Sequence, residues 1–255
     1  MKTAVVVGGG RSLGAFLSKH LATEGFRVAV LDINAENACA VAQEIVSAGG
    51  EAKGYYVNAC QEDSVTEVFA QVSADLGAVY LMLYVAGIAR SAKITEFTLK
   101  DFTCSVDVNL TGYFLCARAA ARIMIDNGIK GRIIQINSKS GCVGSKYNAG
   151  YSASKFGGVG LTQSMALDLA EHGITVNSLM LGNLLYSDMF QSLIPSYAKK
   201  LGIPEDQVVQ TYIDKVPLKR GCEFQDVANV MDFYASEKAS YCTGQSIKIT
   251  GGQVM

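Results

Sequence analysis

The 255-residue sequence contains only two histidines, His20 and His172, and no pair of cysteines in a CxxC arrangement. Histidine chemistry and zinc ligation need such residues close together, so neither a histidine-based mechanism nor a metal site is expected. The formal net charge is −1 and no three basic residues are consecutive, which excludes a typical nucleic-acid-binding surface. No apolar stretch approaches the roughly 20 residues of a membrane span, so no membrane partner is expected.

Seven cysteines are present, an odd number that does not indicate a disulfide framework. We interpret them as reduced thiols that pack as small apolar side chains, which predicts a cytoplasmic protein. The first ten residues, MKTAVVVGGG, run from a short apolar stretch directly into glycines. They are predicted to form a buried first strand rather than a secretion signal.

Short apolar runs alternate with longer segments of helical spacing along the chain. The expected strands are 3–7, 27–31, 53–57, 79–85, 131–137, 174–181 and 246–249, and the expected helices are 13–24, 35–48, 62–76, 99–127, 152–171 and 224–236. Strands this continuously apolar are buried on both faces, so the pattern predicts an α/β fold: a Rossmann-type, doubly wound parallel sheet flanked by helices on both faces. No repeat or domain boundary is visible, so residues 1–255 are predicted to form a single domain.

Proline is scarce: all three prolines fall within one stretch, near 186–220. This stretch follows the sixth expected strand and has no clean strand pattern. Ligands of open α/β sheets bind beyond the carboxyl ends of the strands, so a long excursion there is predicted to be a substrate lid. Two short surface helices punctuated by proline would fit the same residues, and both interpretations can hold together.

A glycine cluster, VGGGRSLG at positions 7–14, lies between the first strand and the first helix. Glycines there allow a tight turn and the close approach of a pyrophosphate to the helix N-terminus. Asp32 ends the second strand, where a carboxylate accepts hydrogen bonds from the adenosine ribose and repels a 2′-phosphate. Arg11 argues weakly for NADP, but Asp32 and the apolar Ile33 favour NAD as the cofactor. A methyltransferase that binds S-adenosylmethionine would use a similar loop and acid.

The pair Tyr151 and Lys155 decides between these classes. Four residues apart at the start of a predicted helix, the two side chains lie on one face. A nearby ammonium lowers the pKa of a phenol and makes it a usable proton acceptor. Ser138 stands at the carboxyl end of the fifth strand, from which its hydroxyl can reach an oxygen held beside Tyr151. Asn109 lies in the preceding long helix, within VDVNLTGYF.

From VGGGRSLG to YCTGQSIKITGG, the sequence resembles the short-chain dehydrogenase/reductase family. The resemblance implies an enzyme in which Tyr151 exchanges the proton, Ser138 holds the substrate oxygen, Lys155 binds the nicotinamide ribose and tunes Tyr151, and Asn109 supports a water-mediated proton relay. It implies that Asn58 meets the adenine and that the backbone of Leu184 meets the carboxamide. The full set of expected cofactor-binding residues is Gly8, Ser12, Leu13, Gly14, Asp32, Asn58, Ala59, Ala86, Gly87, Tyr151, Lys155, Gly182 and Leu184.

The sequence departs from the family pattern at several positions outside the catalytic set. Val7 and Ser12 replace the usual threonine and glycine of the loop, and Leu181 replaces a proline before Gly182. Tyr84 and Val85 replace two asparagines. These departures mark a distinct subfamily and leave dinucleotide binding intact.

Segments such as QINSKSGCVGSK, KLGIPEDQV and DKVPLKRG resemble a member of this family that uses NAD to transfer a hydride at C2 of a hexitol phosphate. The resemblance implies that small-molecule substrate. Lysine acts on a phosphate as a point charge. Lys139 and Lys146 are the preferred phosphate ligands because their loop borders the expected active site; Lys199 and Lys200 lie in the predicted lid. Asn183 is a candidate for a sugar hydroxyl.

Other functions remain open at this point. The chain could act on another polyol or oxo substrate, or could be a dinucleotide-binding redox sensor without turnover. The intact Ser138, Tyr151 and Lys155 weigh against a sensor, because binding alone needs no tuned phenol. In the resembled family the 99–127 and 152–171 helices build subunit interfaces, which implies a homo-oligomer, either a dimer or a tetramer.

Overall fold

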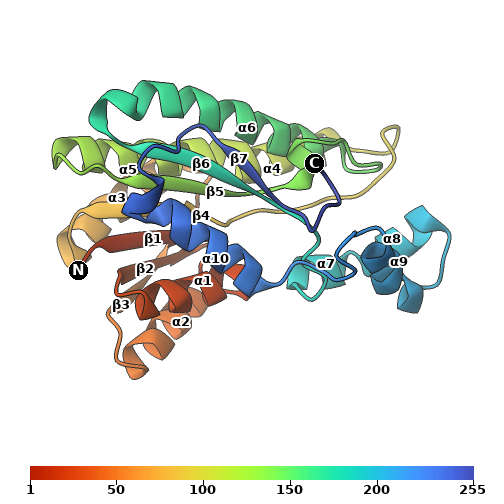
Figure 1. Ribbon diagram of the computed structural model, residues 1–255, viewed down its shortest axis with the longest axis horizontal. Coiled ribbons are helices and arrows are strands. Elements are labelled where there is room, and N and C mark those ends of the chain that lie inside the picture. The colour runs from red at the N-terminus through yellow and green to blue at the C-terminus, as the bar shows by residue number, and fades with distance from the viewer.

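The computed structural model describes residues 1–255 and is built on one seven-stranded parallel sheet (Figure 1). The strand order is β3-β2-β1-β4-β5-β6-β7 and every neighbouring pair is parallel. The chain reverses its direction of strand addition between β1 and β4, the switch point at which such sheets bind ligands. The strands are β1 (Thr3–Val7), β2 (Arg27–Asp32), β3 (Ala52–Tyr56), β4 (Val79–Tyr84), β5 (Arg132–Ser138), β6 (Thr175–Leu181) and β7 (Ser246–Ile249). The predicted fold class is confirmed.

Burial along the strands explains why the apolar runs identified them. Every residue of β1, β4 and β6 is buried, as expected for central strands covered on both faces. The two edge strands, β3 and β7, are only partly buried. Their sequences are correspondingly more polar, with lysine in both.

Helices cover both faces of the sheet (Figure 1). One apolar core joins the sheet to α3 (Glu62–Leu76), α5 (Gly112–Asp126) and α6 (Ala149–Leu169); the other joins it to α1 (Ser12–Thr23), α2 (Ala35–Ser47) and α10 (Phe224–Ala235). Branched and aromatic side chains of the strands fill the two cores alternately. None of the helices combines the length and the apolar character that crossing a membrane requires.

The helix expected over 99–127 contains a π-helical turn, Asp107–Thr111, between α4 (Leu99–Val106) and α5. At this turn the hydroxyl of Tyr84, from β4, donates a hydrogen bond to the carbonyl of Val108. A side chain inserted in this way is a common reason for a departure from regular α-helix geometry. Gly112 leaves room for that hydroxyl: a Cβ atom at position 112 would lie 2.3 Å from the Tyr84 Oη. The tyrosine that departs from the family pattern is therefore accommodated by a glycine and a widened turn.

The 186–220 segment forms three short helices beyond the carboxyl end of β6: α7 (Asp188–Ser192), α8 (Ile194–Leu201) and α9 (Val208–Asp214). They project from the body of the molecule in Figure 1. Pro195 opens α8 and Pro204 precedes a 3-10 turn, so proline marks helix starts here, as its fixed φ favours. A small apolar cluster of their own, centred on Phe190, holds them together. Their role as a lid stays a prediction.

Candidate active site

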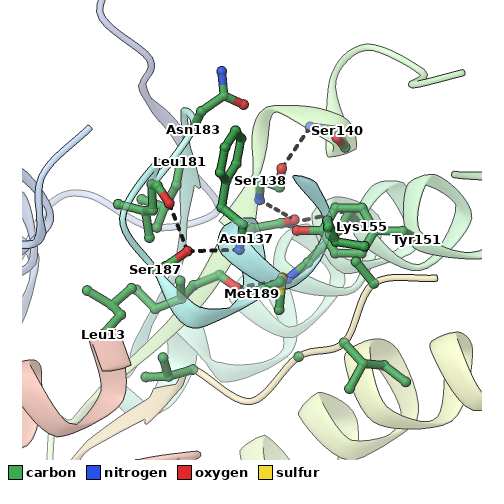
Figure 2. Close-up of a pocket in the computed structure, with 18 of the residues that line it drawn as sticks. Leu13, Asn137, Ser138, Ser140, Tyr151, Lys155, Leu181, Asn183, Ser187 and Met189 are labelled. Carbon is green, nitrogen blue, oxygen red and sulfur yellow. Dashed lines mark hydrogen bonds between the residues drawn. The ribbon is translucent and has the colours of Figure 1, made fainter. Parts of the chain in front are cut away.

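A cavity of about 680 Å³ opens at the carboxyl ends of the strands. Its walls come from the segments that follow β1 to β6, together with α7, α8 and α9. The volume lies within the usual range of small-molecule and cofactor sites. Figure 2 shows Ser138, Tyr151 and Lys155 gathered at one side of it, with Leu13 of α1 on the opposite side.

The glycine loop forms one end of the cavity and cannot carry side chains at two positions. Gly8 has φ +81°, and a Cβ there would lie 2.6 Å from the backbone nitrogen of Ala86. A Cβ on Gly14 would lie 1.9 Å from the carbonyl oxygen of Gly8. No side chain caps the N-terminus of α1 and no acid lies in its first turn. This leaves backbone N–H groups and a positive helix dipole facing the cavity, an arrangement that suits a pyrophosphate.

Ser12, which stands where the family usually has glycine, adopts φ +47°. This left-handed conformation is unusual for a residue with a side chain. The chain thus keeps the backbone turn that glycine normally makes. The substitution therefore leaves the conformation expected of a pyrophosphate-binding loop unchanged.

Asp32 is buried at the end of β2, and backbone groups hold its carboxylate. Its Oδ2 accepts a hydrogen bond from the N–H of Gly10 at 2.9 Å, and its Oδ1 accepts one from Asn34 at 3.0 Å. Each carboxylate oxygen keeps capacity for a further donor, as two ribose hydroxyls require. Ile33 and Arg11 also line the cavity.

The remaining sequence-predicted cofactor residues lie around the same cavity. Ala86 is fixed by a hydrogen bond of its N–H to the Val7 carbonyl at 2.9 Å. Asn58 shapes its own turn by accepting from the N–H of Cys60 at 3.1 Å, which leaves its amide N–H₂ group unused by other residues. The structure thus brings together all the expected cofactor residues: Gly8, Ser12, Leu13, Gly14, Asp32, Asn58, Ala59, Ala86, Gly87, Tyr151, Lys155, Gly182 and Leu184.

Ser138 and Tyr151 meet across the cavity wall. Ser138 is the last residue of β5, and Tyr151 lies in the first turn of α6, which begins three residues earlier than expected. The two side chains lie close enough for the Ser138 hydroxyl to influence the pKa of the Tyr151 phenol. The Ser138 Oγ also accepts from the N–H of Ser140 at 3.1 Å, which fixes its orientation. Two hydroxyls are therefore held side by side, as binding of one carbonyl or alcohol oxygen requires.

The pKa of Tyr151 differs from the expectation. Burial raises it above the ordinary value of a phenol, and the neighbouring Ser138 hydroxyl offsets this only in part. Lys155 does not lower it, because its Nζ donates to the carbonyl of Ile136 at 3.1 Å and lies 5.6 Å from the centre of the Tyr151 ring. Burial lowers the pKa of Lys155 itself to about 8. The predicted lowering of the Tyr151 pKa is wrong for this structure, in which desolvation is the largest effect on that pKa.

Asn109 lies behind the cavity rather than in its wall. Its Oδ1 accepts from the N–H of Ile88 at 2.8 Å, and its Nδ2 donates to the Ile88 carbonyl at 2.9 Å and to the Ser154 hydroxyl at 3.0 Å. Both amide hydrogens are therefore used within the protein. The side chain ties the loop after β4 to α6, one residue before Lys155.

The expected substrate residues separate into two groups. Lys139 and Asn183 line the cavity, and both donate to the Oε1 of Gln253, Asn183 at 3.3 Å. Lys146, by contrast, is exposed and lies outside the cavity wall. The structure adds residues that sequence reasoning did not single out: Lys215, Gln253, and the aromatic rings of Tyr197 and Tyr212 as cavity walls. No local motif marks them, because the tertiary fold alone brings them to the site.

A cavity at the switch point of a doubly wound parallel sheet, bordered by a glycine loop, is typical of Rossmann-fold proteins that bind a dinucleotide. The short chain dehydrogenase family model matches residues 2–198. The chain belongs to the short-chain dehydrogenase/reductase family.

Two relatives are similar over the whole chain. Sorbitol-6-phosphate 2-dehydrogenase of Escherichia coli K12 is 65% identical over 256 residues, which cover 100% of this chain and 99% of that enzyme. A crystal structure of sorbitol-6-phosphate 2-dehydrogenase from Erwinia amylovora is 62% identical, with a TM-score of 0.97, and the match covers 99% of this chain and 100% of that one. The structure of an actinorhodin polyketide ketoreductase with NADPH has a TM-score of 0.94 at 28% identity, covering 99% of this chain and 97% of that one.

Proposed function

We propose that the protein is an NAD-dependent dehydrogenase that interconverts D-glucitol (sorbitol) 6-phosphate and D-fructose 6-phosphate by hydride transfer at C2. The full-length 65% identity to the Escherichia coli enzyme of that name carries the assignment of substrate. The side chains of Ser138, Tyr151 and Lys155, gathered in one cavity wall, carry the assignment of chemistry. Both belong to one cavity that can hold a dinucleotide and a small substrate together.

Bound NAD supplies the acceptor for the hydride that leaves C2. In the proposed reaction Ser138 donates a hydrogen bond to the substrate oxygen, and Tyr151 takes the hydroxyl proton during oxidation or returns it during reduction. Lys155 stands one helical turn from Tyr151 and provides positive charge in a buried setting. The raised pKa of Tyr151 keeps the phenol protonated at neutral pH, ready to donate its proton to the ketone.

We propose NAD rather than NADP as the cofactor, on the strength of Asp32. Its carboxylate is buried and held by two backbone N–H groups, so it cannot turn away from a ribose. A 2′-phosphate would stand against this negative charge. Ile33, the next residue, offers no compensating cation.

The proposed cellular setting and assembly rest on separate features. All seven cysteines are free thiols, which supports a cytoplasmic location because reducing conditions maintain thiols.

Large apolar side chains are exposed on α4, α5 and α6, and they support association with further copies of this chain, as a dimer or tetramer. They are Leu99, Phe102, Phe114, Phe156 and Leu167. Light scattering during size-exclusion chromatography measures the oligomer number.

The decisive assay follows NADH formation from D-glucitol 6-phosphate, beside unphosphorylated D-glucitol, with NAD and with NADP. We expect efficient turnover only with the phosphorylated substrate and NAD. Turnover of neither hexitol would refute the proposed substrate and would favour another polyol or oxo compound.

The matched variants for the cofactor are Asp32→Ala and Asp32→Asn. Asp32→Asn keeps an oxygen acceptor but removes the charge, so it isolates the repulsion of the 2′-phosphate. We expect both variants to lower the ratio of kcat/KM for NAD over NADP by about tenfold or more, since one charged hydrogen bond contributes roughly 1.5–3 kcal/mol. A ratio equal to that of the wild type would contradict the role of Asp32.

A further inference from the structure

Three lysines from separate parts of the chain meet at the substrate end of the cavity. Lys139 directly follows Ser138 at the end of β5, Lys200 lies in the last turn of α8, and Lys215 directly follows α9. All three belong to the cavity wall. Two of them therefore come from the 186–220 segment, and the third is adjacent in sequence to the residue that faces the substrate oxygen.

None of the three lysines forms an ion pair with a carboxylate, although Asp188 also lines the cavity. The Nζ of Lys139 donates to the Oε1 of Gln253, and that of Lys200 donates to the Ser145 hydroxyl at 3.3 Å. Both partners are neutral. Each ammonium still has hydrogens to donate.

The lysines repel one another, and this repulsion lowers their pKa values in addition to the effect of burial. Burial, followed by the charges of Lys215 and Lys200, lowers the pKa of Lys139 to about 8. Burial and the charges of Lys215 and Lys146 lower the pKa of Lys200. Like charges gathered in a cavity without a counterion destabilise the ligand-free protein, and a bound anion removes that cost.

We propose that Lys139, Lys200 and Lys215 together bind the phosphate group of the substrate. This proposal rests on the proposed function for the identity of that substrate and adds the residues that recognise its charged end. A phosphate can accept from all three ammonium groups through its oxygens, as charge-assisted hydrogen bonds. Neutral hexitols gain none of these contacts.

The position of this site also selects the carbon that reacts. The substrate oxygen is held at Ser138 and Tyr151, whereas the phosphate is held at the opposite end of the extended sugar chain. C2 lies four carbons from the C6 that carries the phosphate, but C5 is its immediate neighbour. An anchored phosphate therefore presents C2, rather than C5, to the pair of hydroxyls.

Two other lysines considered from the sequence lack the necessary placement. Lys146 and Lys199 are exposed and neither belongs to the cavity wall. Lys199 precedes Lys200 on the same helix and has the same chemistry. Lys199→Met is therefore a matched control for Lys200→Met.

The test compares the wild type with Lys200→Met, Lys215→Met and Lys199→Met in steady-state oxidation of D-glucitol 6-phosphate. We expect Lys200→Met and Lys215→Met to lower kcat/KM for the sugar phosphate by roughly 10- to 100-fold, the effect of one charge-assisted hydrogen bond, while the KM for NAD stays within about twofold. Lys199→Met should differ from the wild type by less than about twofold in both quantities. Inorganic phosphate should inhibit the wild type in competition with the sugar phosphate, and should inhibit Lys200→Met and Lys215→Met more weakly.

The outcomes separate this proposal from the proposed function. Wild-type values of kcat/KM and of phosphate inhibition in both Lys200→Met and Lys215→Met would overturn the phosphate site even if D-glucitol 6-phosphate is the substrate. If the wild type does not oxidise D-glucitol 6-phosphate, the proposed function fails, and calorimetric titration with inorganic phosphate decides the site. Binding by the wild type that both variants lose would sustain an anion site, and no binding by the wild type would overturn it.

Discussion

The hydroxyl of Tyr151 is the single group on which the proposed chemistry depends most. It lies beside the Ser138 side chain and one helical turn from Lys155. Because burial raises its pKa, the protonated phenol predominates at neutral pH. Reduction of the ketone can use that proton directly, whereas oxidation first requires its loss, so the rate of oxidation should rise with pH.

Tyr151→Phe removes the proton donor and leaves the ring in place. We expect kcat to fall by about 10²- to 10⁴-fold, the usual contribution of general acid–base catalysis, with little change in the affinity for NADH. Stopped-flow or steady-state rates, together with NADH fluorescence titration, measure the two quantities. Tyr147→Phe is the control, because Tyr147 lies in the loop before α6 and outside the cavity wall. A Tyr151→Phe variant with wild-type kcat would remove Tyr151 from the mechanism.

The charge of Lys139 predicts a pH dependence of anion binding. The groups that face it are Lys215, Lys200 and the neutral Gln253. Since its pKa is lowered to about 8, the ammonium loses its proton as pH rises through that value rather than through the ordinary value of 10.5. We expect inhibition by inorganic phosphate to weaken several-fold between about pH 7.5 and about pH 9.

A Lys139→Met variant tests the origin of that dependence. Its phosphate inhibition should be weaker at pH 7.5 and should change less over this interval than that of the wild type, because Lys139 no longer titrates while Lys200, whose pKa is also lowered, remains. An unchanged pH profile in Lys139→Met would assign the titration to another group.

At the scale of helices and strands, the π-helical turn between α4 and α5 accommodates Tyr84, a residue that departs from the family pattern. The Tyr84 side chain is almost fully buried, and its hydroxyl reaches the Val108 carbonyl inside the helix. Gly112 provides the space. The turn also carries Asn109, which joins the loop after β4 to α6. The π-helical turn therefore packs against Tyr84 and also, through Asn109, holds the loop after β4 against α6.

Gly112→Ala should destabilise the protein, because the new methyl group would lie 2.3 Å from the Tyr84 hydroxyl. Overpacking of this kind costs about 1–3 kcal/mol in the free energy of unfolding. Denaturant titration measures it. In the Tyr84→Phe background the hydroxyl is absent, so adding Gly112→Ala should cost clearly less. Equal costs in the two backgrounds would show that the clash with Tyr84 is not the cause.

Across the whole molecule, the cavity and a buried hydrogen-bond network around Arg132 lie at opposite ends of the sheet. The cavity occupies the carboxyl ends of the strands, whereas a buried arginine, Arg132, organises the start of β5. It donates to the carbonyls of Lys130 and Gly131 and to the carboxylate of Glu237, at 2.9, 3.0 and 3.1 Å. Glu237 also accepts from Tyr80 of β4, so this network joins the sheet to the segment after α10.

Arg132→Met should lower the free energy of unfolding by about 2–3 kcal/mol, because buried carbonyls lose their donor. The KM for NAD should not change, since no member of the network touches the cavity. Arg118→Met is the control: the Arg118–Glu62 pair lies at the surface, where such pairs contribute about 0–1 kcal/mol. Urea titration and steady-state kinetics measure both effects. A loss of cofactor affinity in Arg132→Met would contradict the separation of the two ends.

The fold was predictable from the sequence because its signals are local and repeated. Apolar runs identified every strand, since central parallel strands are buried on both faces. The glycine loop, Asp32, Ser138 and the Tyr151–Lys155 pair were recognisable because each stands at a defined point of a strand or helix. Parallel strands then bring those points to one edge of the sheet.

What the sequence determined by itself was the class of fold, the loop for the dinucleotide and the set of groups around the reacting oxygen. Only the tertiary structure decided that Lys200 and Lys215 join Lys139 in the cavity while Lys146 stays outside, because that depends on where α8 and α9 lie relative to the end of β5. It also decided the direction of the Tyr151 pKa shift. Residue spacing conveys which side chains share a helix face, but desolvation and long-range charge depend on everything packed around them.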